Sequence, residues 1–401
     1  MAGITALGTT YNLPNYTGML HQLTPSDTAF FSAIGGLNGG GQTTSAQFEW
    51  QEFDLGTPGQ NVALEGADAP TLEGRVRANV SNVAQIMQRA VGVSYSKLAL
   101  YGQKAGINNE ATNPVRNELD WQVEQALKAM VRDINYSFIN GTYQLPVDNS
   151  TARQTRGMLA AITTNVVNAA ETLVGNGDST WEADDEVITE ATHGLAVGDR
   201  VRIAIDSGAT GASAGYYWVV SVPTANTFTV STTKGGSAQA ISADGVVDVY
   251  KQSAITVAKV NELARTVWEN GGIQEGETAV IVTNSYGKVQ ISEAYANAYG
   301  KFQENSRTVG GVNVSTLVTD FGTLGVMLDR QMPQGTLMLA SLEQCQPVYV
   351  EIPDPDGGMK GHFFAEPLAK TGATDKVQLY GEVGLAYGNQ RAHGKLTGFA
   401  Y

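Results

Sequence analysis

Residues 56–74, GTPGQNVALEGADAPTLEG, constrain the fold more than any other stretch of the chain. The segment has three large apolar side chains, Val62, Leu64 and Leu72, whose complete burial would contribute about 5–9 kcal/mol. Ordering the backbone of a segment this long costs roughly 20–40 kcal/mol. The segment therefore cannot order itself. We expect it to be mobile, or to become ordered only against a partner.

The residues on either side of this segment predict a hairpin. QFEWQEF at 47–53 alternates apolar and polar side chains, and RVRANV at 75–80 does the same, which is the period of a half-buried strand. Two interpretations remain open for Trp50, Arg75 and Arg77: exposed strand residues, or contacts with a neighbouring subunit. With Val62, Leu64 and Leu72 they form a set of candidate inter-subunit contacts.

A long amphipathic helix is predicted next, at residues 116–141. Its apolar side chains recur at steps of three and four, and Gly141 closes it, as expected for a helix with one buried face. The following RQTRG motif supplies Arg153 and Arg156. Arginine suits bidentate pairing with carboxylates across a subunit contact, and a solvated loop explains the motif equally well.

The composition changes between residues 170 and 252. This range has eleven acidic and four basic residues, a net charge of 4 − 11 = −7 out of −14 for the chain. Five strand-like runs are separated by turn signals at HGLAVGD, PTAN and KGG, which is typical of a small β-barrel or sandwich. Helical and mixed sequence on both sides indicates that this is an inserted domain. The rest of the chain predicts an α+β body.

Charge and chemistry exclude several function classes. The net charge of −14 and the lack of a lysine or arginine cluster argue against nucleic-acid binding as the main task. Cys345 is the only cysteine, so it is expected to be a small buried side chain. The N-terminal sequence is not of the secretory type, and no run is long enough for a membrane span. The histidines show no metal-ligand or catalytic spacing. We therefore expect no catalytic residue, cofactor or metal.

Three passages resemble the major capsid proteins of tailed bacteriophages, which have the HK97-type fold. They are EPLAKTGATDKVQLYGEVGLAYGNQRAHGKLTGF at 366–399, TDFGTLGVMLDRQMP, and MVRDINYSFINGT with the later RQTRGMLAAI. The order of arm, hairpin, long helix and strand-rich end is similar as well. The resemblance spans the chain outside 170–252.

The resemblance implies a division of the chain. It makes 1–40 an N-terminal arm, 41–96 an extended β-hairpin loop, 97–149 with 341–401 a peripheral domain with the spine helix, and 150–169 with 253–340 an axial domain. The predicted insert at 170–252 would then be a decoration domain facing outward.

The resemblance also implies a function. The chain would be a structural protein of the virion, assembled in the cytoplasm of a bacterial host into hexamers and pentamers of an icosahedral head around double-stranded DNA. Its partners would be further copies of itself, portal and scaffolding proteins, and a minor or decoration capsid protein, with no membrane and no sequence-specific DNA binding. Two alternatives remain open: the shell of a bacterial nanocompartment with the same fold, and a glycan-binding phage tail or adhesin protein.

Overall fold

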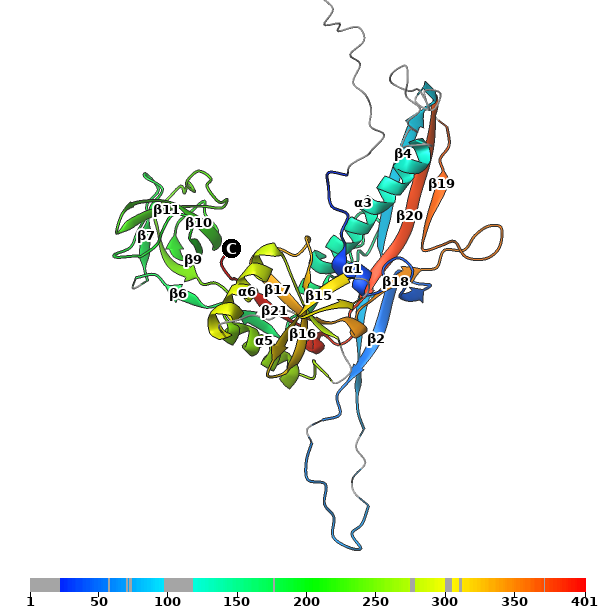
Figure 1. The fold of residues 1–401 in the computed structure, drawn as a ribbon, viewed down its shortest axis with the longest axis horizontal. Helices are drawn as coiled ribbons and strands as arrows, with labels where there is room; N and C mark the ends of the chain where they lie inside the picture. The colour runs from blue at the N-terminus through cyan, green and yellow to red at the C-terminus, as the bar shows by residue number, and fades with distance from the viewer. Residues whose placement is uncertain are drawn as a thin grey trace, which may run out of the picture. The chain divides into compact units, whose positions relative to one another are not determined.

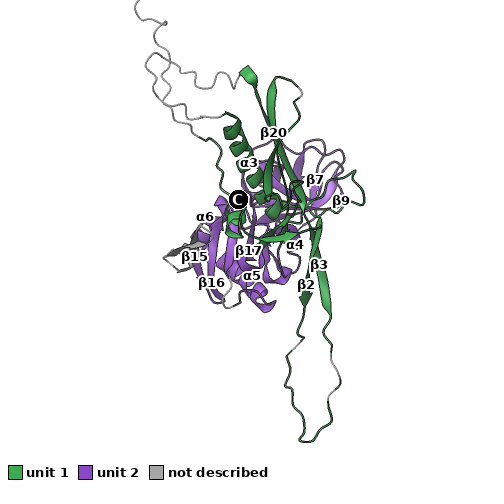
Figure 2. Ribbon diagram, turned by 90° about the vertical axis from the view of Figure 1, so that its right-hand side faces the viewer, with its two compact units in different colours: residues 1–157, 346–386 green, residues 158–345, 387–401 purple. Residues whose placement is uncertain are grey.

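The computed structural model describes residues 22–56, 58–69, 71, 74–96, 118–175, 177–274, 278–299, 305–309, 312–370 and 372–401. The chain divides into two compact units, coloured separately in Figure 2. Unit 1 comprises residues 1–157 and 346–386, and unit 2 comprises residues 158–345 and 387–401.

Unit 1 is built on a five-stranded sheet in which β20 pairs with β4, β18 and β19, while β1 adds in parallel to β18. A separate hairpin, β2–β3, precedes it in the chain. The elements are α1 (Ala29–Ala33), β1 (Gly41–Thr43), β2 (Gln47–Phe53), β3 (Arg77–Val83), β4 (Gln85–Ser94), α3 (Glu118–Asn140), β18 (Gln346–Val350), β19 (Phe363–Pro367) and β20 (Thr374–Ala386).

Helix α3 runs along β4 and β20 (Figure 1). Met130, Ile134 and Phe138 are fully buried on one face of this helix, because residues four apart in a helix share a face. The short α1 packs on the same helix: the Phe31 and Phe138 rings meet edge-on at 5.7 Å, and the Phe31 N–H donates to Asn135 Oδ1 at 2.9 Å. The prediction of a long amphipathic helix is confirmed over Glu118–Asn140.

The body of unit 2 is a seven-stranded sheet in the order β14-β15-β16-β13-β17-β21-β5, with helices α5 and α6 beside it (Figure 1). Its apolar core is shared by both layers. The elements are α4 (Met158–Ala161), β5 (Val166–Asn168), α5 (Val257–Glu269), β13 (Ala279–Thr283), α6 (Ser285–Tyr299), β14 (Asn305–Val309), β15 (Val312–Thr319), β16 (Gly322–Leu328), β17 (Thr336–Ser341), η1 (Leu342–Gln344), η2 (Gln390–Ala392) and β21 (Gly394–Thr397).

A small β-barrel lies between β5 and α5 in the chain. Strand β12 pairs with both β7 and β9, which closes six strands into a ring, and β6 extends β12. The predicted barrel or sandwich is thus a barrel. Its strands are β6 (Glu171–Leu173), β7 (Ser179–Trp181), β8 (Val187–Thr189), β9 (Arg200–Gly208), β10 (Gly215–Thr224), β11 (Thr227–Ser231) and β12 (Gly245–Gln252).

The last fifteen residues of the chain belong to unit 2. Residues 387–401 lie in unit 2 because β21 pairs antiparallel with β17 and parallel with β5, and Phe399 is fully buried in the same core. Cys345 is buried as expected, and this burial raises the pKa of its thiol. No helix among the described residues has the length and apolarity needed to cross a membrane.

Candidate assembly surfaces

The root of the β2–β3 hairpin is fixed to unit 1 by a buried asparagine. The Asn82 amide donates to the backbone carbonyls of Leu385 at 2.7 Å and Arg156 at 3.1 Å. Its Oδ1 accepts from the N–H groups of Arg156 at 2.8 Å and Val83 at 2.9 Å. A buried side chain whose donors and acceptors are all satisfied specifies one geometry. Asn82 therefore fixes the point where the hairpin leaves the sheet.

A glycine lets the hairpin pack closely on β20. A Cβ on Gly384 would lie 2.5 Å from Cε1 of Phe48, so only glycine leaves space for that ring. The Trp50 ring lies 6.2 Å from the Phe48 ring, and Trp50 pairs across the hairpin with Val80. Trp50 is half-buried within the subunit. Neither Asn82 nor Gly384 stands out in the sequence, because their partners are distant along the chain.

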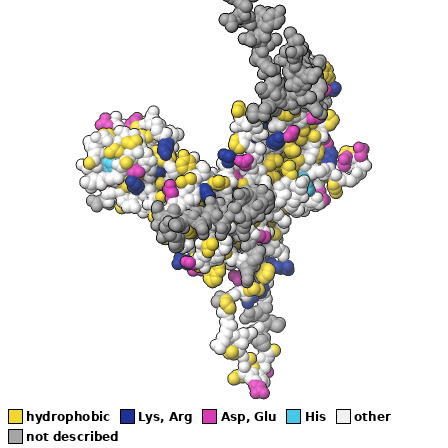
Figure 3. Space-filling view, viewed as in Figure 1, with side chains coloured by type: hydrophobic (Ala, Val, Ile, Leu, Met, Phe, Trp, Pro, Cys, Tyr) yellow, Lys and Arg dark blue, Asp and Glu magenta, His cyan; other side chains and the backbone are white. Residues whose placement is uncertain are grey.

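Beyond this root the hairpin is uncovered. Every described residue from 53 to 79 is exposed, and Figure 3 shows apolar side chains along this part. The exposed fraction is 75% for Val62, 85% for Leu64 and 88% for Val76, while Leu72 lies outside the described residues. Apolar side chains at this exposure make no core in the single subunit. They are available to a partner surface.

The four candidate arginines lie in different surroundings. Arg77 is exposed on β3, and the guanidinium of Arg75 lies against Gly56. Arg153 donates to Glu382 Oε2 at 3.0 Å, within unit 1. Arg156 stacks over the Tyr143 ring at 4.4 Å. The RQTRG arginines therefore already have intrachain partners, and their role between subunits stays a prediction.

The ion pair between Arg153 and Glu382 extends to Tyr380, which bonds the same carboxylate. The hydroxyl of Tyr380 donates to Glu382 Oε1 at 2.6 Å. Burial, together with the Glu382 carboxylate, raises the pKa of Tyr380 to about 12. Both oxygens of the Glu382 carboxylate are thus paired, one with Arg153 and one with Tyr380. This pairing holds the sheet of unit 1 together and leaves no unpaired carboxylate oxygen for catalysis.

A second open surface lies along the N-terminal half of α3. Residues 22–26 and this half of the helix border a groove of about 550 Å³, lined by Leu23, Trp121, Gln125 and Lys128 among others. The apolar residues Leu119, Val123 and Leu127 of the same half are only half-buried. This contrasts with the fully buried face at Met130–Phe138. Among the described residues, one end of α3 is therefore fully buried, and the other is half-buried.

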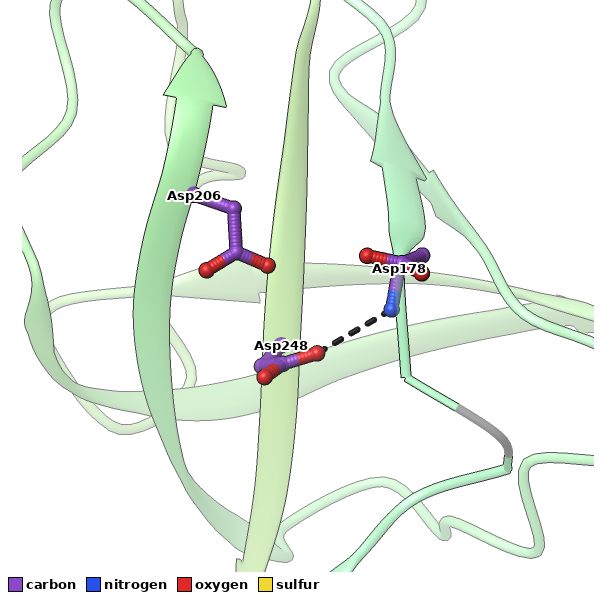
Figure 4. Close-up of side chains that lie close together, drawn as sticks. All are labelled: Asp178, Asp206 and Asp248. Carbon is purple, nitrogen blue, oxygen red and sulfur yellow. Dashed lines mark hydrogen bonds between the residues drawn. The ribbon is translucent and has the colours of Figure 1, made fainter.

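The barrel carries a group of three acidic side chains on its surface. The carboxylates of Asp178, Asp206 and Asp248 have oxygens within 4.8 Å of one another (Figure 4). Asp248 accepts two hydrogen bonds: Oδ1 from the Asp178 N–H at 3.0 Å and Oδ2 from the Tyr250 hydroxyl at 3.2 Å. Asp178 and Asp206 are exposed. These oxygens could hold a cation, but exposed acidic groups gather without one, so we assign no metal to them.

Two buried histidines bind backbone groups. In His393, Nδ1 accepts from the Ser341 N–H at 3.2 Å and Nε2 donates to the Tyr387 carbonyl at 2.7 Å. His193 repeats this arrangement in the barrel, with the Leu195 N–H at 3.0 Å and the Thr224 carbonyl at 3.3 Å. Because a backbone N–H can only donate, Nδ1 is unprotonated in both rings. Both imidazoles are structural, and neither is aligned with a nucleophile among the described residues.

Comparisons with known proteins identify the family and the fold. A family model described as SU10 major capsid protein matches residues 3–400. The capsid asymmetric unit of cyanophage A-1(L) superposes with a TM-score of 0.53 at 12% identity, covering 96% of this chain and 97% of that chain. This likeness shows a shared fold.

Two further solved structures are more distant. A structure of Mycobacterium phage Cain gives a TM-score of 0.49 at 11% identity, covering 98% of this chain and 96% of that chain. The holo-SrpI encapsulin complex from Synechococcus elongatus PCC 7942 gives 0.47 at 9% identity, with 90% and 84% covered. No curated protein matches the sequence.

Proposed function

The chain belongs to the SU10 major capsid protein family, has the HK97-like capsid fold and is the coat subunit of a tailed-phage head, and we propose how it builds that head. Copies associate into hexamers and pentamers that close into an icosahedral shell around double-stranded DNA. The role is structural, in the virion capsid, and the subunit catalyses no reaction.

The parts of the chain take different tasks in this proposal. Residues 1–40 are the arm, 41–96 the extended loop, 97–149 with 341–401 the peripheral domain, and 150–169 with 253–340 the axial domain. Since 387–401 pack in unit 2, the last part of the peripheral range also supports the axial sheet. Portal and scaffolding proteins, and a minor or decoration capsid protein, complete the head.

The uncovered hairpin carries the proposal. Its root is fixed by Asn82, yet every described residue from 53 to 79 is exposed. Ordering such a segment costs more than its own apolar contacts return. Lying over a neighbouring subunit would bury Val62 and Leu64 and so contribute stability to the lattice rather than to the single chain. The exposed Arg77 would supply polar contacts at the same surface.

The charge of the subunit supports enclosure of DNA without tight binding. A net charge of −14 repels the phosphate backbone, whose neutralisation drives protein–DNA affinity. A shell wall with this charge would contain DNA without holding it at particular sequences.

The barrel serves as an outward decoration domain in this proposal. Its two connections to the body are adjacent, since the Ser253 N–H donates to the Ala170 carbonyl at 3.0 Å. A module entered and left at neighbouring positions can be added to a fold without disturbing it. Replacing 170–252 by a short linker should therefore leave a soluble subunit that still assembles. Insolubility of the remainder would show that the barrel is part of the core.

The main experiment is deletion of residues 56–74 with a short Gly-Ser turn in their place. We expect a folded subunit, with the circular dichroism and melting temperature of the intact chain, that forms no closed shells by electron microscopy. The chain with the barrel removed is the matched control, because it loses more residues and should still form shells. Intact shells from the loop deletion would contradict the proposal.

The content of purified particles separates the phage head from the nanocompartment alternative. Particles from the native source should contain double-stranded DNA, released by heat and digested by DNase. Particles filled with a protein cargo and free of DNA would favour the nanocompartment.

A further inference from the structure

The barrel is joined to the body of unit 2 by two chain segments, 169–171 and 252–254, which we call the neck. Residues Thr397–Tyr401, here called the strap, cross this neck. The Ala169 N–H donates to the Thr397 carbonyl at 2.8 Å, and the Ala400 N–H donates to the Ser253 carbonyl at 3.1 Å. The strap therefore contacts both segments of the neck.

The strap is anchored in the body. Phe399 is fully buried in the core beneath the seven-stranded sheet, and the Gly398 N–H donates to the Gly335 carbonyl at 2.9 Å. Gly398 has φ of +81°, and a Cβ there would lie 3.2 Å from the Tyr216 hydroxyl and 3.3 Å from Gln252 Nε2. This backbone conformation favours glycine, and a side chain here would be in tight contact with two barrel side chains.

Tyr401 joins the two parts through its ring. On the barrel side the Trp218 ring meets it edge-on at 5.0 Å, and on the body side the Tyr286 ring of α6 lies at 6.2 Å. The guanidinium carbon of Arg200, on β9, lies over the Tyr401 ring at 3.9 Å from its centroid. One aromatic side chain therefore packs between barrel and body.

Arg200 is held by ring faces instead of hydrogen bonds. Its guanidinium also lies 4.8 Å from the Tyr216 ring centroid and 5.7 Å from that of Trp218. Nε and Nη1 are buried and have no hydrogen-bond partner among the described residues. Burial lowers the pKa of Arg200 accordingly. Desolvated donors without acceptors oppose the packed arrangement, whereas the cation–π contacts favour it.

Gln252 is a second buried polar side chain that opposes the packed arrangement of barrel and body. It is 3% exposed, and neither its amide oxygen nor its amide nitrogen has a partner among the described residues. Turning the barrel away from the strap would return these groups and the Arg200 donors to water. The contact between barrel and body thus combines favourable aromatic packing with unfavourable desolvation, as expected of a contact that can open.

We propose that Arg200, Trp218 and Tyr401 form a releasable latch that sets the orientation of the barrel on the body. When the latch opens, the barrel turns about its neck, and the barrel and the body each stay folded. Barrels could then adjust to one another where subunits meet at different angles. The inference concerns the single subunit and does not depend on how shells form.

Hydrogen exchange of the full chain tests the latch. Arg200→Ala and Tyr401→Ala should each raise the exchange rates of the Ser253 and Ala400 amides about tenfold or more. The amides of β10 and β11 should keep their rates. Lys234→Ala is the matched control: this exposed lysine also lies over the Trp218 ring, at 4.7 Å, but on the barrel alone, and its replacement should leave the neck amides within twofold.

Two outcomes would overturn the proposal. Unchanged neck amides in both latch variants would mean that the backbone bonds of the neck alone fix the barrel. Exchange in β10 and β11 that rises together with the neck in Tyr401→Ala would mean that the contact stabilises the barrel fold instead of its orientation. Assembly of the variants, scored separately by electron microscopy, bears only on the proposed function.

Discussion

The barrel and the extended part of the hairpin differ in where their apolar side chains lie. Trp181, Ile188 and Phe228 are fully buried inside the barrel. Because β12 pairs with both β7 and β9, each of the six strands in the ring has a hydrogen-bonded neighbour on both sides. The hairpin has two strands, and beyond the root that packs on β20 its described residues from 53 to 79 are exposed. A closed sheet provides its own core and hides its edges. A long two-stranded ribbon does neither.

The difference shows where stability resides in a coat subunit. The barrel should be equally stable in a free subunit and in a shell, because its core consists of its own residues. The hairpin segment should gain its order only from neighbours, so its stability depends on concentration and assembly. The next experiments test this contrast, beginning with the largest expected change in unfolding free energy.

Trp181→Ala should destabilise the barrel by about 3–5 kcal/mol, since it removes a fully buried indole that meets the Tyr217 ring edge-on at 5.8 Å. The measurement is the opening free energy of barrel amides by hydrogen exchange. Trp268→Ala, at a side chain 55% exposed on α5, is the control and should cost less than about 1 kcal/mol. Equal losses would mean that the barrel is not an independent core.

Asn82→Ala should destabilise unit 1 by about 2–3 kcal/mol, because it removes the amide's hydrogen bonds to the buried carbonyl of Leu385 and to the part-buried backbone of Arg156. Denaturant unfolding of the full chain measures the loss. Asn79→Ala, three residues earlier on the same strand, removes an exposed bond to Glu49 and should stay within about 0.5 kcal/mol. A neutral Asn82→Ala would show that the hairpin root is not fixed by this amide.

The double substitution Val62→Ser and Leu64→Ser should leave the free subunit within about 0.5 kcal/mol of the original. Both side chains are exposed, so nothing in the single chain is lost. The concentration needed for shell assembly, followed by light scattering, should rise clearly. An unchanged assembly concentration would indicate that this segment does not contact a neighbour.

The smallest effect is expected at high pH. The pKa of Tyr380 is raised from 10.0 to about 12 by burial and by Glu382, so the folded state keeps its proton where the unfolded state loses it. The stability of unit 1 should therefore fall as the pH rises from 10 toward 12. Tyr380→Phe should reduce this slope in unfolding experiments, and Tyr136→Phe, at an exposed tyrosine, should not. Identical slopes in the two variants would contradict the assignment.

Local periodicity was sufficient to predict much of the fold. The helix at 118–140 and most barrel strands are predicted from the sequence, because each has one buried face that recurs at a fixed period. The exposed hairpin segment was predicted from its shortage of apolar side chains, which is a property of the segment alone.

The remaining features depend on contacts between distant residues. Strand β4 pairs with β20 nearly three hundred residues later, Gln88 opposite Tyr380, and its residues show no clear alternation. The roles of Asn82 and Gly384 depend on partners far away in the sequence. Asn82 bonds Arg156 and Leu385, and Gly384 leaves space for Phe48. The Arg200–Tyr401 contact joins a barrel strand to a segment two hundred residues away. No pattern within one element signals such partners.

Hydrogen exchange of residues 54–76, compared between free subunits and assembled shells, tests the central claim most directly. The account predicts fast, nearly unprotected exchange in the free subunit and strong protection in the shell, while the β9–β12 amides are equally protected in both. Strong protection of 54–76 in the free subunit, or none in the shell, would contradict it.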